Sequence, residues 1–257
     1  MHTNYRSCII CGSDESFNFL LGEYNGLKKV RCSVCGHVYA NPVPSEEEYN
    51  SWYKLDTFWI KEQQRLGHPT IFDRIEQDYI IADARVNYII CELGAKESVG
   101  KTVLDVGCSN GSFVRRAKEK GFNCEGTELY PEVVSIARNN SKAIIHEGEL
   151  FSITFNKKYD VIILNDVLEH CYEPLNVLDL IKDLVSTNGL LVLEIPDREC
   201  IEAKQQKLNW RHLHYKEHLF LFSYEDINKL LSERGFIIMN WFRPIPAKLA
   251  IYARKVK

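Results

Sequence analysis

The sequence predicts an α/β protein built on a doubly wound, mostly parallel sheet, with a small cysteine-bearing module in front of it. Three observations carry this prediction. Strand-like and helix-like segments alternate along residues 99–257, the run TVLDV leads directly into the glycine loop GCSNG, and two Cys-x-x-Cys pairs occur within the first 35 residues. Repeated β-then-α order is typical of parallel sheets, since each helix returns the chain to the same edge. A chain of 257 residues can bury a core of this size.

The chain divides into three regions. Residues 1–48 form the cysteine module and end in NPVPSEEE, where two prolines predict a turn and Ser45 a helix N-cap. Residues 49–98 form a helical linker or cap, in which an apolar helical stripe runs until Gly94 stops it. The stripe consists of Ile75, Tyr79, Ala82, Val86, Ile89 and Leu93. Residues 99–257 form the main domain.

The first half of the main domain contains four strand-like runs. The strand TVLDV precedes the helical segment SFVRRAKEK, which ends at Gly121, and the strand NCEGTEL precedes a helix that Pro131 opens. KAIIH is a short strand. The apolar run YDVIILN is typical of a strand that is buried on both faces of a parallel sheet.

The second half continues the alternation with one interruption. Pro174 opens a helix, and Asn188-Gly189 predicts the turn before the strand NGLLVLEIP. A capping box that starts at Ser223 begins the last helix, and FIIMNWF and KLAIYAR form two final strands. Residues 197–222 do not fit the alternation. Because an insertion after the carboxyl end of a strand lies over the ligand crevice of such folds, we expect this segment to be a lid.

Composition argues against several kinds of partner. The formal net charge is −3 and the pI about 6.3, with no basic block, so nucleic acid is an unlikely partner. No apolar run reaches the roughly 18 residues that span a bilayer. The N-terminal stretch MHTNYRSC has no apolar core of a secretory signal. We therefore expect a cytoplasmic protein without a membrane span.

The paired cysteines predict a metal site. Cys8 and Cys11 form one pair and Cys32 and Cys35 the other, and a glycine follows each pair. In a reducing compartment this spacing favours a metal over disulfides. Four thiolates complete a tetrahedral, structural Zn²⁺ site with no open position for catalysis. A redox dithiol or unpaired buried thiols are the alternatives.

The loop between the first strand and helix of the main domain predicts a nucleotide-type ligand. Gly107 and Gly111 permit close approach of a ligand and positive φ, while Ser109 takes the position of a third glycine. Asn110 is among the few residues that adopt left-handed conformations readily. Glu128 follows Gly107 by 21 residues, at the end of the second strand, where a carboxylate can accept hydrogen bonds from both ribose hydroxyls. Dinucleotide folds share the loop pattern, which alone is weak evidence.

The order and spacing of five motifs resemble class I S-adenosylmethionine-dependent methyltransferases. The motifs are VLDVGCSNGSF, EGTEL, HEGELF, YDVIILNDVLEH and NGLLVLEIPD, and the resemblance covers roughly residues 100–254. Ser109 stands where that family usually has glycine, and Glu149 where aspartate is common. The resemblance implies a Rossmann-like sheet of seven strands with an antiparallel last strand, and S-adenosyl-L-methionine as the cofactor.

The resemblance also implies roles for individual residues. Asp105 and Gly107 match the positions that hold the amino and carboxyl ends of the methionine part, within the loop that includes Ser109 and Gly111. Glu128 matches the ribose carboxylate. The remaining matches are Leu129 beside the adenine, Glu149 and the Leu150 backbone at the adenine amino group, and Asn165 at the sulfonium end.

The cysteine module in front of the main domain resembles a bacterial group of methyltransferases that act on sugars of surface polysaccharides and glycosylated metabolites. We therefore expect O-methylation of a small-molecule or glycan substrate, a sugar or sugar-nucleotide. A fainter resemblance to ribosomal-RNA guanine methyltransferases keeps RNA open as an alternative. Methylation of a carbon atom of a keto-sugar is an alternative that stays within the sugar substrates. The non-enzymatic alternative is a scaffold that binds the cofactor without activity.

A hydroxyl acceptor benefits from a general base, for which histidine is best suited. We expect His170 and His218 to be the catalytic pair, without choosing between them. His170 follows the fourth strand, and His218 lies on the expected lid. The alternative bases are His212, His214, Asp166 and Glu169. Four aromatic residues are candidates for stacking on a sugar, although such residues more often belong to the core: Trp210, Trp52, Tyr53 and Trp59.

Overall fold

The computed structural model describes residues 4–14, 18–24, 26–52, 61, 63–65 and 67–256. Tyr53 and Trp59, two of the expected stacking residues, lie outside the described residues. The chain forms two compact units. The first comprises Met1–Asn50, Asn165–Asp183 and Leu190–Lys257, and the second comprises Ser51–Leu164 and Leu184–Gly189.

A seven-stranded sheet confirms the predicted fold class within the described residues. Its strand order is β10-β11-β8-β7-β4-β5-β6. β4 pairs in parallel with β5 and β7, and β5 pairs in parallel with β6. The last strand, β11, runs antiparallel to both neighbours, β8 and β10. The strands are β4 Thr102–Val106, β5 Asn123–Glu128, β6 Ile145–Glu147, β7 Tyr159–Asn165, β8 Val185–Pro196, β10 Phe236–Phe242 and β11 Lys248–Lys255.

The strand β7 shows why an unbroken apolar run forms the middle of this sheet. The four consecutive residues 161–164 are completely buried, on alternating faces of the strand. Helices cover both faces of such sheets, so no position along the strand needs a polar side chain. The structure does not have the turn that was predicted at Asn188-Gly189 before the strand NGLLVLEIP. Both residues lie within β8, although Asn188 has the positive φ of 61° that a turn residue would have.

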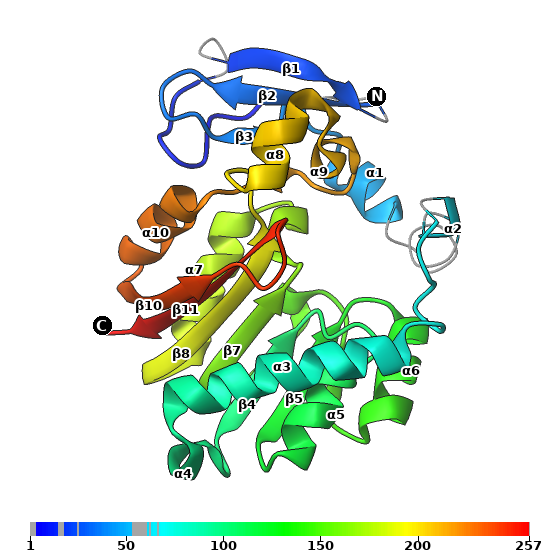
Figure 1. The fold of residues 1–257 in the computed structure, drawn as a ribbon, viewed down its shortest axis with the longest axis vertical. Helices are drawn as coiled ribbons and strands as arrows, with labels where there is room; N and C mark the ends of the chain where they lie inside the picture. The colour runs from blue at the N-terminus through cyan, green and yellow to red at the C-terminus, as the bar shows by residue number, and fades with distance from the viewer. Residues whose placement is uncertain are drawn as a thin grey trace. The chain divides into compact units, whose positions relative to one another are not determined.

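The helix α3 (Ile75–Leu93) confirms the predicted stripe in the second unit. Ala82, Val86 and Ile89 are buried, and Gly94 ends the helix with a φ of 87°. α3 packs along α5 (Ser112–Glu119), as Figure 1 shows. The other helices of this unit are α2 Gln63–Arg65, α4 Ala95–Ser98 and α6 Pro131–Ser141. No helix of the described chain is both long enough and apolar enough for a membrane crossing.

The first unit contains a second, four-stranded antiparallel sheet in the order β1-β2-β3-β9. β1 (Asn18–Tyr24), β2 (Leu27–Cys32) and β3 (Val38–Ala40) come from the N-terminal region. β9 (Phe220–Leu221) comes from the segment that was expected to be a lid. The helices of this unit are α1 Glu46–Ser51, α7 Pro174–Leu184, α8 Ile201–Gln206, α9 Arg211–His214 and α10 Tyr224–Ser232.

The segment 197–222 packs against this second sheet. β9 pairs with β3, and α8 and α9 lie beside the β strands of the N-terminal region (Figure 1). A buried cluster joins them through Val38, Cys200, Ala203, Trp210, Leu213 and Leu221. Trp210 is only 2% exposed. It is therefore a core residue, and the alternative that it stacks on a sugar is wrong.

Candidate functional site

The loop after β4 has the conformation that its glycines predict. Gly107 and Gly111 have φ values of 69° and 75°. A Cβ at Gly111 would come within 2.8 Å of the carbonyl oxygen of Ala137, so glycine is required there. Ser109 itself adopts the left-handed conformation, with φ of 51°, and Asn110 does not. The expectation that Asn110 would supply this conformation was wrong.

Asn110 instead fastens the loop to its surroundings. Its side-chain amide donates to Asp78 of α3 at 2.7 Å, and its side-chain oxygen accepts from the backbone N–H of Ser112 at 3.1 Å. Asn140 of α6 donates to the backbone carbonyl of Asn110 at 2.9 Å. These contacts satisfy the first turn of α5 and hold the loop between two helices. Sequence reasoning missed this role because the partners lie about 30 residues away on either side.

The Glu128 carboxylate is held at the end of β5 beside this loop. One oxygen accepts from the backbone N–H of Ser109 at 3.0 Å and the other from that of Leu129 at 2.7 Å. Burial raises the pKa of Glu128 to about 7, although these N–H groups oppose the shift. The backbone N–H of Tyr130 also favours the charged form of this carboxyl group. A carboxylate has two oxygens with about four acceptor positions, so capacity remains for the hydroxyl donors of a ligand.

Asp105 is a second buried carboxyl group, near the end of β4. It is 3% exposed, and burial, together with the negative charge of Glu128, raises its pKa to about 7 against the effect of Arg85. Two desolvated carboxyl groups favour a ligand that brings positive charge or hydrogen-bond donors to them. The pair is therefore a candidate binding site for a ligand that carries positive charge or hydrogen-bond donors.

The other predicted cofactor residues lie at ends of the same strands. Leu129 follows Glu128, and the backbone N–H of Gly148 donates to the Glu128 carbonyl at 3.0 Å. This bond places the turn with Glu149 and Leu150 next to β5; Glu149 is exposed. Asn165 ends β7, one residue after Leu164, which pairs with Val106 of β4. Because carboxyl ends of parallel strands share one sheet edge, β4, β5 and β7 end at the same edge. The cofactor roles of these residues stay predictions.

A histidine cluster forms in the first unit. His170 ends the short 3₁₀ helix η4 (Leu168–His170), and its ring centroid lies 4.8 Å from that of His218. His212 of α9 stacks on His218 at 5.3 Å. The structure thus brings the two predicted bases together. His214 lies apart from them, against the Tyr24 ring and the carbonyl of Leu208.

Burial keeps the histidine cluster neutral. It lowers the pKa of His170 to about 4 and that of His212 to about 3, and it lowers the pKa of His218 as well. Burial and the negative charge of Asp166 raise the pKa of Glu169 far above its usual range. Donor atoms of Glu169, His170 and His218 lie within 4.8 Å of one another, a spacing that a metal ion could bridge. A neutral carboxyl group makes this the weaker of two candidate metal sites.

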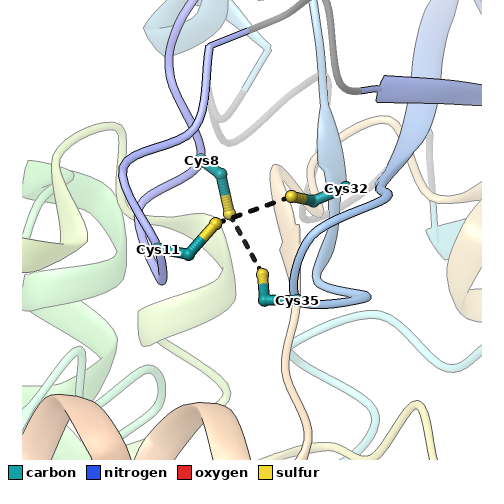
Figure 2. A group of neighbouring side chains, drawn as sticks. All are labelled: Cys8, Cys11, Cys32 and Cys35. Atoms are coloured by element: carbon teal, nitrogen blue, oxygen red, sulfur yellow. Dashed lines mark hydrogen bonds between the residues drawn. The ribbon is translucent and has the colours of Figure 1, made fainter.

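The four paired cysteines converge on one point (Figure 2). Their sulfur atoms all lie within 4.8 Å of one another, at 3.5 Å between Cys8 and Cys35 and 3.6 Å between Cys11 and Cys32. A tetrahedral zinc ion with Zn–S bonds of about 2.3 Å holds its sulfurs about 3.8 Å apart. All four thiols are free of disulfides. The donor set therefore fits a tetrahedral metal ion.

The two cysteine knuckles have the same backbone geometry. The N–H of Gly12 donates to the Cys8 carbonyl, and that of Gly36 to the Cys32 carbonyl, both at 2.8 Å. Burial by itself would raise the pKa of Cys32. Hydrogen bonds to its sulfur, of which that from Ser13 has the largest effect, outweigh burial and lower the pKa to about 6. Burial raises the pKa of Cys8 and that of Cys35, the latter to about 11, so without a metal ion the four thiols do not ionise together.

The sheet, the loop and the buried carboxyl groups define the class I S-adenosylmethionine-dependent methyltransferase fold. The profile of the family described as "Methyltransferase domain" matches residues 80–239, more than half of the chain. The chain therefore belongs to this family, and the class of protein predicted from the motifs is confirmed.

Solved structures of low identity share the fold. Magnesium protoporphyrin IX methyltransferase from Synechocystis PCC 6803, with bound SAH, has a TM-score of 0.61 at 17% identity and covers 82% of this chain and 100% of that one. A S-adenosylmethionine-dependent methyltransferase from Clostridium acetobutylicum has a TM-score of 0.53 at 13% identity, over 66% of this chain and 89% of that one. At such identities the likeness shows the fold alone.

Curated relatives match part of the chain. A ubiquinone biosynthesis O-methyltransferase from Haemophilus ducreyi is 28% identical over 131 residues, 47% of this chain and 55% of that enzyme. Nodulation protein S from Azorhizobium caulinodans is 30% identical over 117 residues, 43% of this chain and 54% of that protein. The chain thus spans about half the length of these relatives.

The raised pKa of Asp105 predicts a pH-dependent cost to the ligand-free protein. Because the folded-state pKa of about 7 exceeds the ordinary value of 3.8, the folded protein keeps a proton that the unfolded chain releases between these values. The free energy of unfolding therefore falls as pH rises from about 4 to 7. Asp105→Asn removes the ionisation. At pH 8 its free energy of unfolding should exceed that of the wild type by roughly a few kcal/mol, and its melting temperature should be higher by several degrees.

Thermal melts from pH 5 to 8 check this prediction. The difference between Asp105→Asn and wild type should grow with pH, whereas Asp183→Asn, at an exposed carboxylate, should give a constant difference. A pH-independent difference for Asp105→Asn would contradict the assigned burial cost.

Proposed function

We propose that this protein transfers a methyl group from S-adenosyl-L-methionine to a hydroxyl oxygen of a sugar or sugar-nucleotide. The Glu128 carboxylate, fixed by the N–H groups of Ser109 and Leu129 beside the glycine loop, is the observation that carries the cofactor assignment. Its geometry suits a ribose diol. A dinucleotide cofactor also has a ribose diol, but the chain belongs to a family of methyltransferase domains, which favours S-adenosyl-L-methionine.

The proposed cofactor site uses residues from the strand ends. Asp105 and the backbone of Gly107 hold the methionine part, where a buried carboxyl group stabilises the ammonium. Glu128 binds the ribose, and Glu149 accepts from the adenine amino group. Leu129 and Leu150 pack against the adenine, Ser109 and Gly111 shape the loop around the cofactor, and Asn165 lies at the sulfonium end.

When bound, the cofactor supplies an electrophilic methyl carbon on a sulfonium leaving group. The chain's contribution is to align the acceptor oxygen in line with that bond, because alignment supplies much of the acceleration. His170 and His218 provide a base for the acceptor proton. Burial lowers the pKa of both imidazoles, so each is neutral at pH 7 and holds a lone pair. The same shift weakens each ring as a base, so proton transfer depends on close placement of the acceptor hydroxyl.

Oxygen is supported as the acceptor atom by relatives named as O-methyltransferases. The sugar class rests on the resemblance of the N-terminal cysteine arrangement to sugar-modifying methyltransferases. The formal charge of −3 and the absence of a basic block in the sequence support a small molecule over RNA.

We also propose that the four cysteines hold a structural Zn²⁺ ion. The free thiols and the convergence of their sulfur atoms support this assignment. Four protein ligands leave no position for a substrate, so the ion would stabilise the N-terminal sheet and take no part in transfer.

Glu128→Gln tests the cofactor site. Gln keeps the shape but donates where the carboxylate accepts, and loss of charged hydrogen bonds costs about 1.5–3 kcal/mol. The dissociation constants for S-adenosylmethionine and S-adenosylhomocysteine should rise roughly 10- to 100-fold in calorimetric titrations. Glu132→Gln, at an exposed carboxylate in the next helix, is the matched control and should bind as the wild type does. Equal affinities for the two variants would refute the assignment.

A panel of acceptors tests the reaction. Labelled donor should transfer label to a nucleotide sugar with free hydroxyls, and the panel should include a keto-sugar nucleotide, a catechol and RNA. Label that appears only in RNA would overturn the assignment of a sugar acceptor. Label on a carbon atom of the keto-sugar would overturn O-methylation. No turnover with any acceptor would favour a cofactor-binding scaffold without activity.

The histidine variants belong in the same assay. His170→Ala and His218→Ala should each lower turnover by about 10²- to 10⁴-fold, the usual contribution of a general base, while donor affinity stays the same. His214→Ala, outside the cluster, is the control. Full activity in both cluster variants would eliminate the histidine hypothesis.

Cys11→Ala tests the metal site, because Cys11 is the exposed member of the four and its loss disturbs packing least. Elemental analysis should find one zinc ion per wild-type chain and little zinc in the variant. Cys91→Ala, at another exposed cysteine, should retain the full zinc content. If the wild-type chain is produced in medium that contains zinc and elemental analysis finds no zinc in the purified protein, the proposal is refuted.

A further inference from the structure

A buried lysine from the N-terminal region holds the segment that carries His218. Lys29 lies on β2 and is completely buried. Its ammonium group donates to the backbone carbonyl of Tyr215 at 3.3 Å and to that of His218. Burial lowers the pKa of Lys29 to about 7, and the negative charge of Glu217 opposes the shift. A buried amine requires such acceptors, so this segment and β2 are fixed together.

Tyr49 joins the same segment to His170. Its hydroxyl lies 2.8 Å from the carbonyl oxygen of His170 and 2.6 Å from the carbonyl oxygen of Glu217. Tyr49 is 2% exposed, on α1. The hydroxyl has a single hydrogen and both carbonyl oxygens only accept, so the shorter contact assigns the hydrogen bond to the Glu217 carbonyl, with the His170 carbonyl beside it.

The Glu217 carbonyl also contacts the ring of His170. Nδ1 of His170 lies 3.0 Å from this oxygen. A carbonyl oxygen only accepts hydrogen bonds, so Nδ1 must carry the hydrogen. In a neutral imidazole the other nitrogen then holds the lone pair. Nε2 of His170 is therefore the basic atom of this ring.

His218 has no such constraint. Its Nδ1 is buried without a hydrogen-bond partner among the described residues, so no contact at this nitrogen selects a tautomer. Nε2 of His170 lies 4.0 Å from the Glu169 carboxyl group, too far for a direct hydrogen bond. The contact of Nδ1 with the Glu217 carbonyl thus determines the tautomer of His170, and Nδ1 of His218 has no such contact among the described residues.

We propose that Tyr49 is a positioning residue that holds the Glu217 carbonyl against Nδ1 of His170, so that Nε2 presents its lone pair to the acceptor. This inference rests on the proposed function. As the acceptor oxygen bonds to the methyl carbon and the carbon–sulfur bond breaks, the hydroxyl proton moves to Nε2. The imidazolium then releases this proton to water. Tyr49 acts through His170 and touches no substrate.

Nitrogen NMR of the purified chain of 257 residues tests the proposal. With ¹⁵N-labelled histidine at pH 8, the hydrogen-bearing and lone-pair nitrogens of each ring resonate far apart, and the spectrum of His170→Gln assigns the His170 signals. Wild-type His170 should carry its hydrogen on Nδ1. In Tyr49→Phe the ratio of the Nδ1–H to the Nε2–H tautomer should fall roughly three- to ten-fold, the value of one neutral hydrogen bond.

Tyr172→Phe is the matched control. Tyr172 packs 6.1 Å from the Tyr49 ring, but its hydroxyl donates to the carbonyl of Pro44 at 2.9 Å, so the His170 ratio should stay at the wild-type value. Hydrogen on Nε2 of wild-type His170, an unchanged ratio in Tyr49→Phe, or an equal change in Tyr172→Phe would each overturn the proposal. No cofactor or acceptor is added, so failure of the transfer assay leaves this measurement intact. Failure of tautomer control likewise leaves the transfer proposal standing.

Discussion

The carboxylate of Glu128 is the constraint on which the candidate cofactor site depends. It ends one strand and binds the backbone of Ser109 in the loop after another, and so fixes their separation. Ser109 has a left-handed φ, which costs a non-glycine residue about 1–2 kcal/mol. The charge-assisted hydrogen bond to Glu128 offsets this strain. The same carboxylate therefore explains how serine can stand in the loop where glycine is usual, and it is the group that we propose for the ribose.

The N-terminal region and the later segments of the first unit form one structure. β3 pairs with β9, and the Asp226 carboxylate accepts from His37 at 3.0 Å and from Arg198 at 3.2 Å. Burial would raise the pKa of Asp226, but the bond to His37 and the charges beside it hold the pKa at about 2. Asp226 also caps α10. One buried carboxylate thus links three parts of the chain, so the cysteine-bearing region is integral to this unit.

Local patterns predicted the secondary structure well. The apolar stripe of α3, the proline at the start of α6 and the capping box at Ser223 each act within one or two helical turns, and all three are confirmed. The convergence of the four cysteines followed from their spacing. Their metal, the roles of the cofactor residues and the catalytic histidines remain predictions.

Contacts between distant segments could not be predicted from the same patterns. Lys29 and Tyr49 reach carbonyl groups about 120 to 190 residues away, and nothing in their neighbouring residues signals those partners. Asn110 was assigned a backbone role, yet its side chain makes the loop's tertiary bonds. For Trp210 both stacking on a sugar and a core role were open, and the structure places it in the cluster with Val38 of β3 and Leu221 of β9.

Both candidate sites hold polar groups at a cost to stability. Asp105 and Glu128 in one unit, and Lys29 and His170 in the other, have pKa values that burial shifts against their charged forms. A fold selected for stability alone would replace such groups with apolar ones, and shifted pKa values gather at functional sites. Lys29 precedes Cys32 by three residues on β2. A metal ion at the cysteines would therefore restrain the strand whose lysine holds the His218 segment, which gives the cysteine cluster a physical connection to the histidines.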